Sequence, residues 1–454
     1  MGETPQRRRR ARRIGCAALV LLISIGVWIV LRDDPPPDDA DLLPEPIAEV
    51  PLGESVYGAL VDALAALPEP REWAWEEYRR AETAGESPPR EPWGPCPLDR
   101  AVWSAPDRLA VMGEYYAGVS AGIDRIAAAL ERERGGWPGQ SAETAGSDSP
   151  WSAAATRHFL SRALYRRARG DLAGASLDLE TLNRIGESPL AEGARSWLRG
   201  MIACTTSEIA WTGWESLLHD GDLAPEVEER IIAVPPILDR DPGVVARCYR
   251  NEYSCTRENL QTYDPAEDRW VDGRTLLLRL FLKRNRTLAA YAEAIRHDLA
   301  QIDLPPPRRT SAQAWNVDGA IRRAILHANS GDWIIANGLG NGEIIIRSFD
   351  RLRIVTRAVR TLVALRAFER ARGALPTDLA ALVAAFPALG NIPIDPYSGA
   401  PFGYDPARRI LWSVGEDGVD GNGDGWEALR DDPEASRYAL PDWIWPIPPL
   451  PGGR

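Results

Sequence analysis

Lysine is almost absent from this chain of 454 residues, because Lys283 is the only lysine beside 52 arginines. The four histidines are also few, and none lies in an HExxH sequence or beside a nucleophile motif. No CxxC pair occurs, and the glycine-rich run 338–342 lacks the lysine and Ser/Thr of a P-loop. These absences argue against a zinc site, a thioredoxin-like redox site and a nucleotide site, and we predict no catalytic residue.

Positive charge is scarce after position 13. The whole chain carries 53 basic and 65 acidic residues, and without the six Arg and one Glu of positions 1–13 these fall to 47 and 64, a net charge of −17. Nucleic-acid binding needs a basic footprint, so we expect no nucleic-acid partner. The 44% hydrophobic content is ordinary for a globular protein, and the length allows two or three domains.

The N-terminus has the pattern of a membrane anchor. Six arginines between positions 7 and 13 precede the run 14–31, which contains no charged residue. In a helix this run spans about 27 Å, close to the thickness of a bilayer core. The positive-inside rule predicts that residues 1–13 form a cytoplasmic tail and that the body is extracytoplasmic. The expected location is therefore the inner (cytoplasmic) membrane, crossed once by a transmembrane helix that contacts the lipid bilayer.

A cleaved signal peptide is the alternative interpretation of this segment. It is less favoured because no small-x-small site closes the run, and Trp28-Ile29-Val30-Leu31 would occupy the cleavage position. Residues 32–53 follow as a linker rich in proline and acidic residues. Such a composition favours an extended polyproline II spacer that holds the body away from the membrane.

Residues 54–342 are predicted to form a mainly α domain, an irregular helical bundle. Between positions 109 and 130 apolar residues recur at steps of three and four, which is one face of a helix. The helices that we expect cover residues 56–67, 73–84, 107–134, 151–169, 172–185, 190–219, 225–233, 244–263 and 273–302.

One part of this domain, residues 163–182, resembles a tetratricopeptide (TPR) hairpin with its turn at Gly170-Asp171. No second copy recurs at a fixed period, so a single hairpin in an irregular bundle is the favoured interpretation. The sequence around Ser120 matches G-x-S-x-G, but it lies in a helical pattern, whereas a nucleophile elbow needs a strand before the serine. We interpret it as a chance match.

Four cysteines, Cys96, Cys204, Cys248 and Cys255, would reach an oxidising compartment in which disulfides persist. On an unbroken helix the Cα atoms of Cys248 and Cys255 are about 10 Å apart, too far for a disulfide. A break at Asn251 would allow that bond, and otherwise Cys204 could pair with either. The connectivity stays open.

The C-terminal part has a different pattern, predicted as a small α+β lobe over residues 343–432. A long helix over 344–372 ends at Gly373, and a short helix over 375–382 has Pro376 near its first turn. A strand follows over 409–414, and then a loop rich in Gly and Asp. The last segment, 433–454, is predicted as a tail rich in proline and tryptophan.

The motifs of this lobe occur in the order found in one family. They are Gly373, Pro376 and Leu379; Asp395-Pro396, Gly399, Pro401 and Tyr404; and Ser413, Gly415, Asp417 and Gly418. Residues 345–426 therefore resemble the C-terminal domain of the major (G-type) pseudopilins of type II secretion. They also resemble membrane-anchored proteins of planctomycete-like bacteria that join a helical body to this ending.

The resemblance implies a pseudopilin-like domain fold but not assembly into a pseudopilus. In a pseudopilin the membrane helix is continuous with the long helix and follows a prepilin cleavage site. Here the whole region 32–343 separates the two, and that cleavage signature is absent.

The loop after the predicted strand matches the calcium-binding pattern D-x-[DN]-x-[DN]-G. Alternate residues of such a loop direct oxygens into one cavity, as a hard cation requires. We therefore expect a structural Ca²⁺, with an acidic surface turn as the alternative. The pattern supplies the ligands Asp420, Asn422, Asp424, Trp426 through its carbonyl group, and Asp431, and the pseudopilin resemblance adds Asp417.

These features together predict a membrane-anchored, extracytoplasmic scaffold or protein-interaction protein related to the bacterial envelope or to secretion, with an unidentified protein partner. The alternative is an exported hydrolase that uses carboxylates of the helical domain. A buried pair of carboxylates in a pocket would favour the enzyme, and an exposed apolar groove would favour the binding protein.

Overall fold

The computed structural model describes residues 24, 32–44, 63–67, 106–131, 149–191, 197–221, 223–262, 282–310, 322–323, 329, 331, 342–431 and 437–450. The chain divides into two compact units. Unit 1 comprises Met1–Pro44, Tyr253–Gln301 and Thr310–Glu343, and unit 2 comprises Glu45–Glu252, Ile302–Arg309 and Ile344–Arg454. This division differs from the single helical domain expected over 54–342, because the segment Tyr253–Gln301 belongs to unit 1 together with the N-terminal residues.

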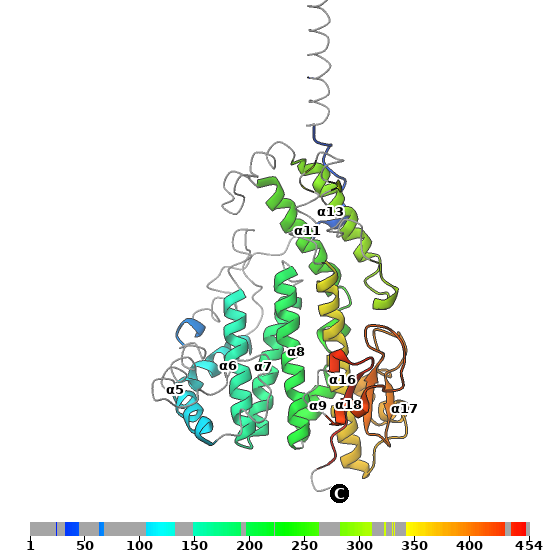
Figure 1. The fold of residues 1–454 in the computed structure, drawn as a ribbon. Helices are drawn as coiled ribbons and strands as arrows, with labels where there is room; N and C mark the ends of the chain where they lie inside the picture. Colours follow the sequence, from blue (N-terminus) through cyan, green and yellow to red (C-terminus); the bar gives the residue numbers. More distant parts are fainter. Residues whose placement is uncertain are drawn as a thin grey trace, which may run out of the picture. The chain divides into compact units, whose positions relative to one another are not determined.

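The described fold is mainly helical, as expected, and has one small sheet of three strands (Figure 1). The helices are α5 (Pro106–Glu131), α6 (Ser149–Ala168), α7 (Leu172–Ala191), α8 (Trp197–Asp220), α9 (Pro225–Ala233), α10 (Ile237–Arg240), α11 (Val244–Thr262), α13 (Arg284–Leu299), α16 (Gly342–Arg372), α17 (Leu379–Ala385) and α18 (Trp426–Asp431). The strands are β1 (Gly403–Asp405), β2 (Ile410–Ser413) and β3 (Trp443–Pro446).

Most expected helices of the bundle are present, with three differences. The expected helix 190–219 is wrong at its start, because α7 continues to Ala191 and α8 begins at Trp197. The helix expected over 273–302 is described only from Arg284 onward. Of the helix expected over 56–67 only residues 63–67 are described, and 63–65 are helical; the helix expected over 73–84 lies outside the described residues.

The predicted membrane anchor also lies outside the described residues, apart from Ser24. None of the helices that the structure describes combines the length and the apolar character that a membrane span requires.

In unit 2, α6, α7 and α8 lie side by side and form its helical core (Figure 1). The chain reverses between α6 and α7 at Gly170, so the predicted hairpin is present. The approach of α7 to α8 depends on Gly186. A Cβ atom there would lie 2.7 Å from the Ser207 nitrogen and 2.8 Å from the Ala203 oxygen, so a side chain would force the backbones apart.

The C-terminal lobe begins with α16, which ends where the sequence predicts. Gly373 has a φ of 77°, a left-handed conformation that glycine adopts without steric cost and that commonly ends a helix. The prediction for the next helix is wrong at its start. Helix α17 begins at Leu379, because the Asp378 side chain accepts a hydrogen bond of 2.7 Å from the Ala381 nitrogen and so caps the helix.

The sheet of the lobe contains two strands that were not expected. Strand β2 is central and antiparallel to both neighbours, with Tyr404 opposite Leu411 and Leu411 opposite Trp445. Strand β3 comes from the segment predicted as a tail, which is therefore part of the lobe. One core cluster on this sheet consists of Ile410, Trp412, Leu429 and Ile444.

Candidate functional site

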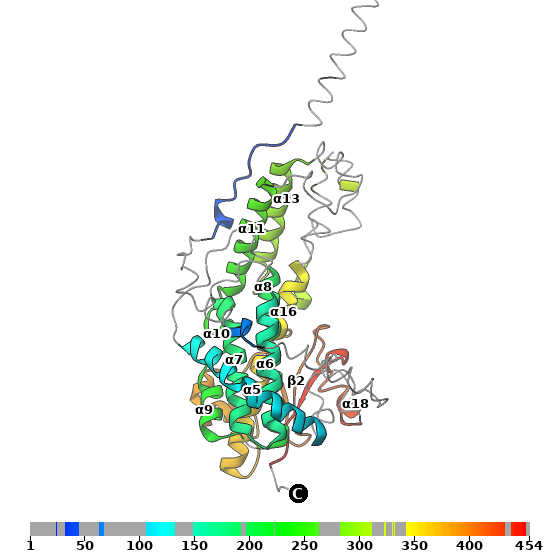
Figure 2. The ribbon, with the colours of Figure 1, turned by 90° about the vertical axis from the view of Figure 1, so that its left-hand side faces the viewer.

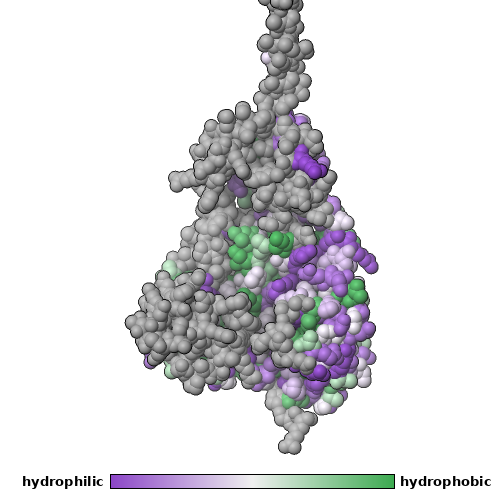
Figure 3. Space-filling model, in the orientation of Figure 1, coloured by the Kyte–Doolittle hydropathy of each residue, from purple (hydrophilic) through white to green (hydrophobic). Residues whose placement is uncertain are grey.

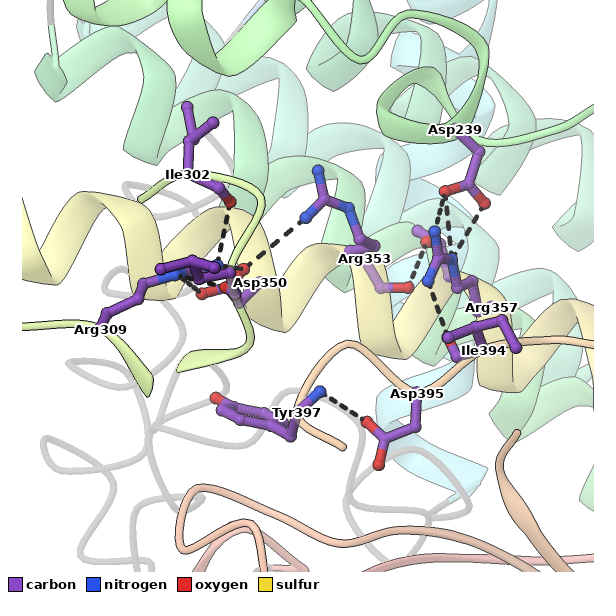
Figure 4. A network of polar contacts seen from close by, with 11 residues as sticks. Asp239, Ile302, Arg309, Asp350, Arg353, Arg357, Ile394, Asp395 and Tyr397 are labelled. Atoms are coloured by element: carbon purple, nitrogen blue, oxygen red, sulfur yellow. Dashed lines mark hydrogen bonds and ion pairs between the residues drawn. The ribbon is translucent and has the colours of Figure 1, made fainter. Parts of the chain in front are cut away.

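Several ion pairs of unit 2 lie along α16, where charged side chains of this helix pair with those of other segments (Figure 4). Asp350 is almost fully buried, and its Oδ1 accepts a hydrogen bond of 3.1 Å from Arg309 Nη2. Two helical turns further, Arg357 pairs with Asp239 at 2.7 Å and donates to the Ile394 carbonyl oxygen at 2.7 Å. These contacts join α16 to the segment 302–309, to α10 and to the loop that follows α17.

A second set of ion pairs joins α8 to the lobe. Glu208 accepts from Arg351 at 2.6 Å and from the Tyr438 hydroxyl at 3.1 Å, and Glu215 accepts from Arg437 at 2.6 Å. These two carboxylates are the clearest pair on one helix in the described part of the chain, yet each is neutralised by an arginine. Their arrangement is that of a structural cross-link between elements.

Asp395 is a buried carboxylate held by uncharged donors, and it organises the lobe. It is 1% exposed, and its side chain accepts four hydrogen bonds. The donors are the Tyr397 nitrogen (3.0 Å), the Ser398 hydroxyl (3.2 Å), the Ser413 hydroxyl (2.9 Å) and the Val414 nitrogen (3.1 Å). Figure 4 shows its carboxylate beside the Tyr397 nitrogen. A carboxylate with this many donors is held in one orientation and fixes both segments.

The motif segments of the lobe therefore meet in space. Asp395 and Ser413 belong to two of them, and the Tyr404 hydroxyl donates to the Pro376 carbonyl oxygen at 2.9 Å, which links the turn after α16 to β1. The sequence indicates these residues only by their order along the chain, and the structure gives each a partner.

Hydrogen bonds between side chains and backbone hold the predicted calcium loop in place. Asp420 Oδ1 accepts from the Trp412 indole nitrogen at 3.0 Å and from the Asn422 nitrogen at 2.9 Å. The Asn422 carbonyl oxygen accepts from Arg408 at 2.6 Å, and the Asp424 side chain is exposed.

The centre of this loop is Asp442, which the sequence analysis did not identify. Its carboxylate is buried and accepts from the nitrogens of Gly421 (3.3 Å), Gly423 (2.7 Å) and Asp424 (2.8 Å). Burial raises its pKa, the three N–H groups oppose that rise, and the nearby Asp420 carboxylate adds to it. Asp442 lies far beyond the loop in the sequence, so no spacing pattern could indicate it.

The other predicted ligands are placed differently. Trp426 begins α18, where carbonyl groups point along the helix axis toward residues four positions later. Asp417 is exposed and accepts from the Val419 nitrogen at 2.9 Å. Asp431 is the last residue of α18, and its side chain lies outside the described part.

The positions of these side chains can be compared with what a Ca²⁺ site requires. Ca²⁺ takes six to eight oxygen ligands. Within the described residues no three or more His, Cys, Asp or Glu side chains form a group that could hold a metal ion. Asp420 and Asp442 nevertheless bring two carboxylates close together at this loop.

A separate polar cluster lies in the helical core of unit 2. His158 is 1% exposed, its Nδ1 lies 3.4 Å from the Tyr115 hydroxyl, and burial lowers its pKa to about 4. One turn further on α6, Arg162 is buried and pairs with Asp178 at 2.6 Å and with Asp124 at 2.7 Å. Ser120 lies inside α5, and its carbonyl oxygen accepts from Arg162 at 3.3 Å, so the G-x-S-x-G match is not a nucleophile elbow.

No disulfide joins the described cysteines Cys204, Cys248 and Cys255. Cys204 and Cys248 are buried, and burial raises the pKa of the Cys248 thiol to about 12, whereas Cys255 is partly exposed. Neither disulfide considered from the sequence, Cys248–Cys255 or one with Cys204, is present among these three residues, and Cys96 lies outside the described part.

The visible face of the lobe is mostly hydrophilic, with smaller apolar areas between the polar ones (Figure 3). Val419, 63% exposed, is the most exposed large hydrophobic residue of the described part of the chain, and its sequence neighbours within two positions are glycines and aspartates.

Comparison of the chain with family models, with curated proteins and with solved structures found no match.

Proposed function

We propose that this protein is a membrane-anchored, extracytoplasmic scaffold that holds a partner protein at the bacterial envelope. The observation that carries the proposal is the N-terminal pattern of six arginines followed by the uncharged run 14–31, which favours a single span with the body outside. The bilayer is then the first partner, through residues 14–31.

The distribution of buried carboxylates supports a scaffold over the alternative, an exported hydrolase. A hydrolase needs carboxylates that are free to accept or donate a proton at a substrate. Glu208, Glu215, Asp350 and Asp178 are instead each bound to arginine. Burial raises the pKa of Asp178 and of Asp350, and the paired arginines oppose that rise by favouring the anion. These contacts serve to hold elements together.

We also propose that the lobe from Ile344 onward has the fold of a pseudopilin C-terminal domain. Support comes from the order of the motifs and from the meeting of Asp395 with Ser413 and of Tyr404 with Pro376. The α6–α7 hairpin is proposed as TPR-like on the turn at Gly170.

Calcium remains a proposal for the loop around Asp420. The support is the spacing of Asp420, Asn422 and Asp424 together with the proximity of the Asp420 and Asp442 carboxylates, whose repulsion a divalent cation would cancel. Such an ion would stabilise the lobe and would have no catalytic role.

Crosslinking in native membranes tests the scaffold. Full-length protein and a variant with residues 1–31 replaced by a cleavable signal peptide would be crosslinked in cells and purified. We expect a stoichiometric membrane-protein partner with the anchored chain and its loss with the released chain. An anchored chain that purifies alone, together with hydrolase activity that Glu208→Gln abolishes without unfolding, would support the enzyme instead.

A further inference from the structure

The first residues after the predicted span are built into unit 1. Residues 33–42, which we call the strap, include Pro35-Pro36-Pro37 and were expected to form a free spacer. Three groups of contacts attach the strap to α13 and to the second half of α11. This finding corrects the linker prediction for these residues.

The first attachment is at the start of α13. The residue that precedes this helix is Lys283, whose side chain has no acceptor and makes no capping bond to the helix. Asp33 supplies that acceptor, because its Oδ2 accepts from the Asn285 nitrogen at 2.9 Å and its Oδ1 from the Arg286 nitrogen at 3.2 Å. These are two of the N–H groups that a helix leaves unpaired, and the carboxylate also faces the positive end of the helix dipole.

The second attachment is buried. Asp39 is 6% exposed and accepts from the Tyr253 hydroxyl at 2.7 Å, and it pairs with Arg257 at 3.0 Å. Tyr253 stacks on Tyr291 of α13 with ring centroids 5.7 Å apart, so α11 and α13 lie side by side at this point (Figure 2). Leu42, in the short 3-10 helix Ala40–Leu42, is 1% exposed. Removal of the strap would leave a buried tyrosine without its acceptor.

The third attachment is exposed and weaker. Arg296 of α13 donates to both oxygens of Asp41, at 2.9 and 2.5 Å, and to the Asp38 carbonyl oxygen at 2.6 Å. Exposed ion pairs are screened by water and salt and contribute little to stability. Asp33, Asp39 and Leu42 therefore decide whether the strap stays in place.

From these contacts we infer that the strap fixes unit 1 directly against the membrane surface and does not act as a spacer. This inference deepens the proposed function, and its statement about the membrane rests on the proposed anchor. Only Arg32 separates Asp33 from the end of the apolar run at Leu31. Two residue steps span at most about 7 Å. The first turn of α13 then lies next to the lipid headgroups, and a partner held by unit 1 is a protein that also lies at the membrane surface.

Hydrogen exchange of the full-length protein in lipid nanodiscs tests the strap. Asp33→Ala removes the cap, so we expect exchange in the first turn of α13 to rise about tenfold, because local opening costs less free energy. Asp39→Ala removes the acceptor of the Tyr253 hydroxyl and should raise exchange in the second half of α11. The matched control is Asp34→Ala, whose side chain makes none of these bonds, and it should leave both peptides unchanged. Unchanged exchange in α13 of Asp33→Ala would overturn the strap.

A separate measurement tests the position at the membrane. A fluorophore on Arg286→Cys, with Cys16, Cys96 and Cys255 replaced by serine, should be quenched by a quencher attached to lipid headgroups. A flexible Gly-Ser insertion after Leu31, long enough to cross the headgroup layer, should weaken that quenching and leave exchange in α13 unchanged. Absence of quenching in the chain without the insertion would overturn the position of unit 1 at the membrane surface. If hydrogen exchange in α13 nevertheless rises in Asp33→Ala, the contacts of the strap are supported and the proposed membrane anchor is contradicted.

Discussion

The Ser413 hydroxyl donates a hydrogen bond of 2.9 Å to Asp395 Oδ1, and this bond joins the end of β2 to the turn that precedes β1. Both groups are buried, and the Val414 nitrogen donates to the second oxygen of the same carboxylate at 3.1 Å. The lobe therefore closes around one anion, and substitutions at Asp395 test how much of its stability depends on that anion.

Asp395→Ala should lower the free energy of unfolding of unit 2 by about 3 kcal/mol or more, because it leaves several buried donors unpaired. Ser413→Ala removes one bond and should cost about 1 kcal/mol. Urea unfolding followed by circular dichroism measures both. Equal, small effects of the two substitutions would contradict a central role for Asp395.

His158 predicts a dependence of stability on pH. Its pKa is lowered to about 4 in the folded protein, from 6.5, because burial disfavours the charged imidazole. Between these values the unfolded chain binds a proton that the folded protein does not, so stability falls as the pH falls from about 6.5 to 4, by roughly 3 kcal/mol.

His158→Gln should remove this contribution, so its free energy of unfolding should change less over this interval than that of the wild type. The comparison is one of slopes, since the substitution also alters packing. Parallel slopes for the two proteins would show that His158 does not resist protonation.

Gly186→Ala tests the close approach of α7 to α8. The added methyl group would meet the backbone of α8, and we expect a loss of about 1–3 kcal/mol. Gly118→Ala is the matched control in α5, because nothing lies within 4 Å of its added Cβ. Alanine is the better helix former, so this control should gain up to about 1 kcal/mol. Equal effects at both glycines would contradict the contact.

Calcium is tested by the melting temperature of the full-length protein in detergent. We expect a higher melting temperature in calcium than in chelator, because a ligand that binds only the folded state stabilises it by mass action. Asp420→Ala should remove most of this difference, and Glu427→Gln, at an exposed position of α18, should not. Identical melting temperatures in calcium and in chelator would show that the loop binds no Ca²⁺ and that Asp442 alone organises it.

The sequence predicts those elements whose signals are local. Helix α9 has the expected bounds because Pro225 can begin a helix and the apolar residues that follow have helical spacing. Gly373 ends α16 for a similar local reason. Strand β3 was missed because prolines surround Trp443–Pro446 and its partner β2 lies much earlier in the chain.

The carboxylates that organise polar clusters were harder to predict, because their partners also lie far away along the chain. Asp442 is distant in sequence from the loop that it holds, and Asp33 caps a helix that begins far away, at Arg284. No spacing rule connects such residues, since only the tertiary fold brings them together. The calcium pattern, by contrast, is local and was found, but a local pattern does not show where the carboxylates point.

Topology tests the central claim most directly. A reporter that is active only outside the cytoplasm would be fused after Arg454 of the full-length chain, and the mature N-terminus would be sequenced from the membrane fraction. The account predicts an active reporter on a membrane-bound protein that retains its arginine-rich N-terminus. A soluble product that begins near residue 32, or a reporter that stays inactive on a chain with its N-terminus intact, would contradict it.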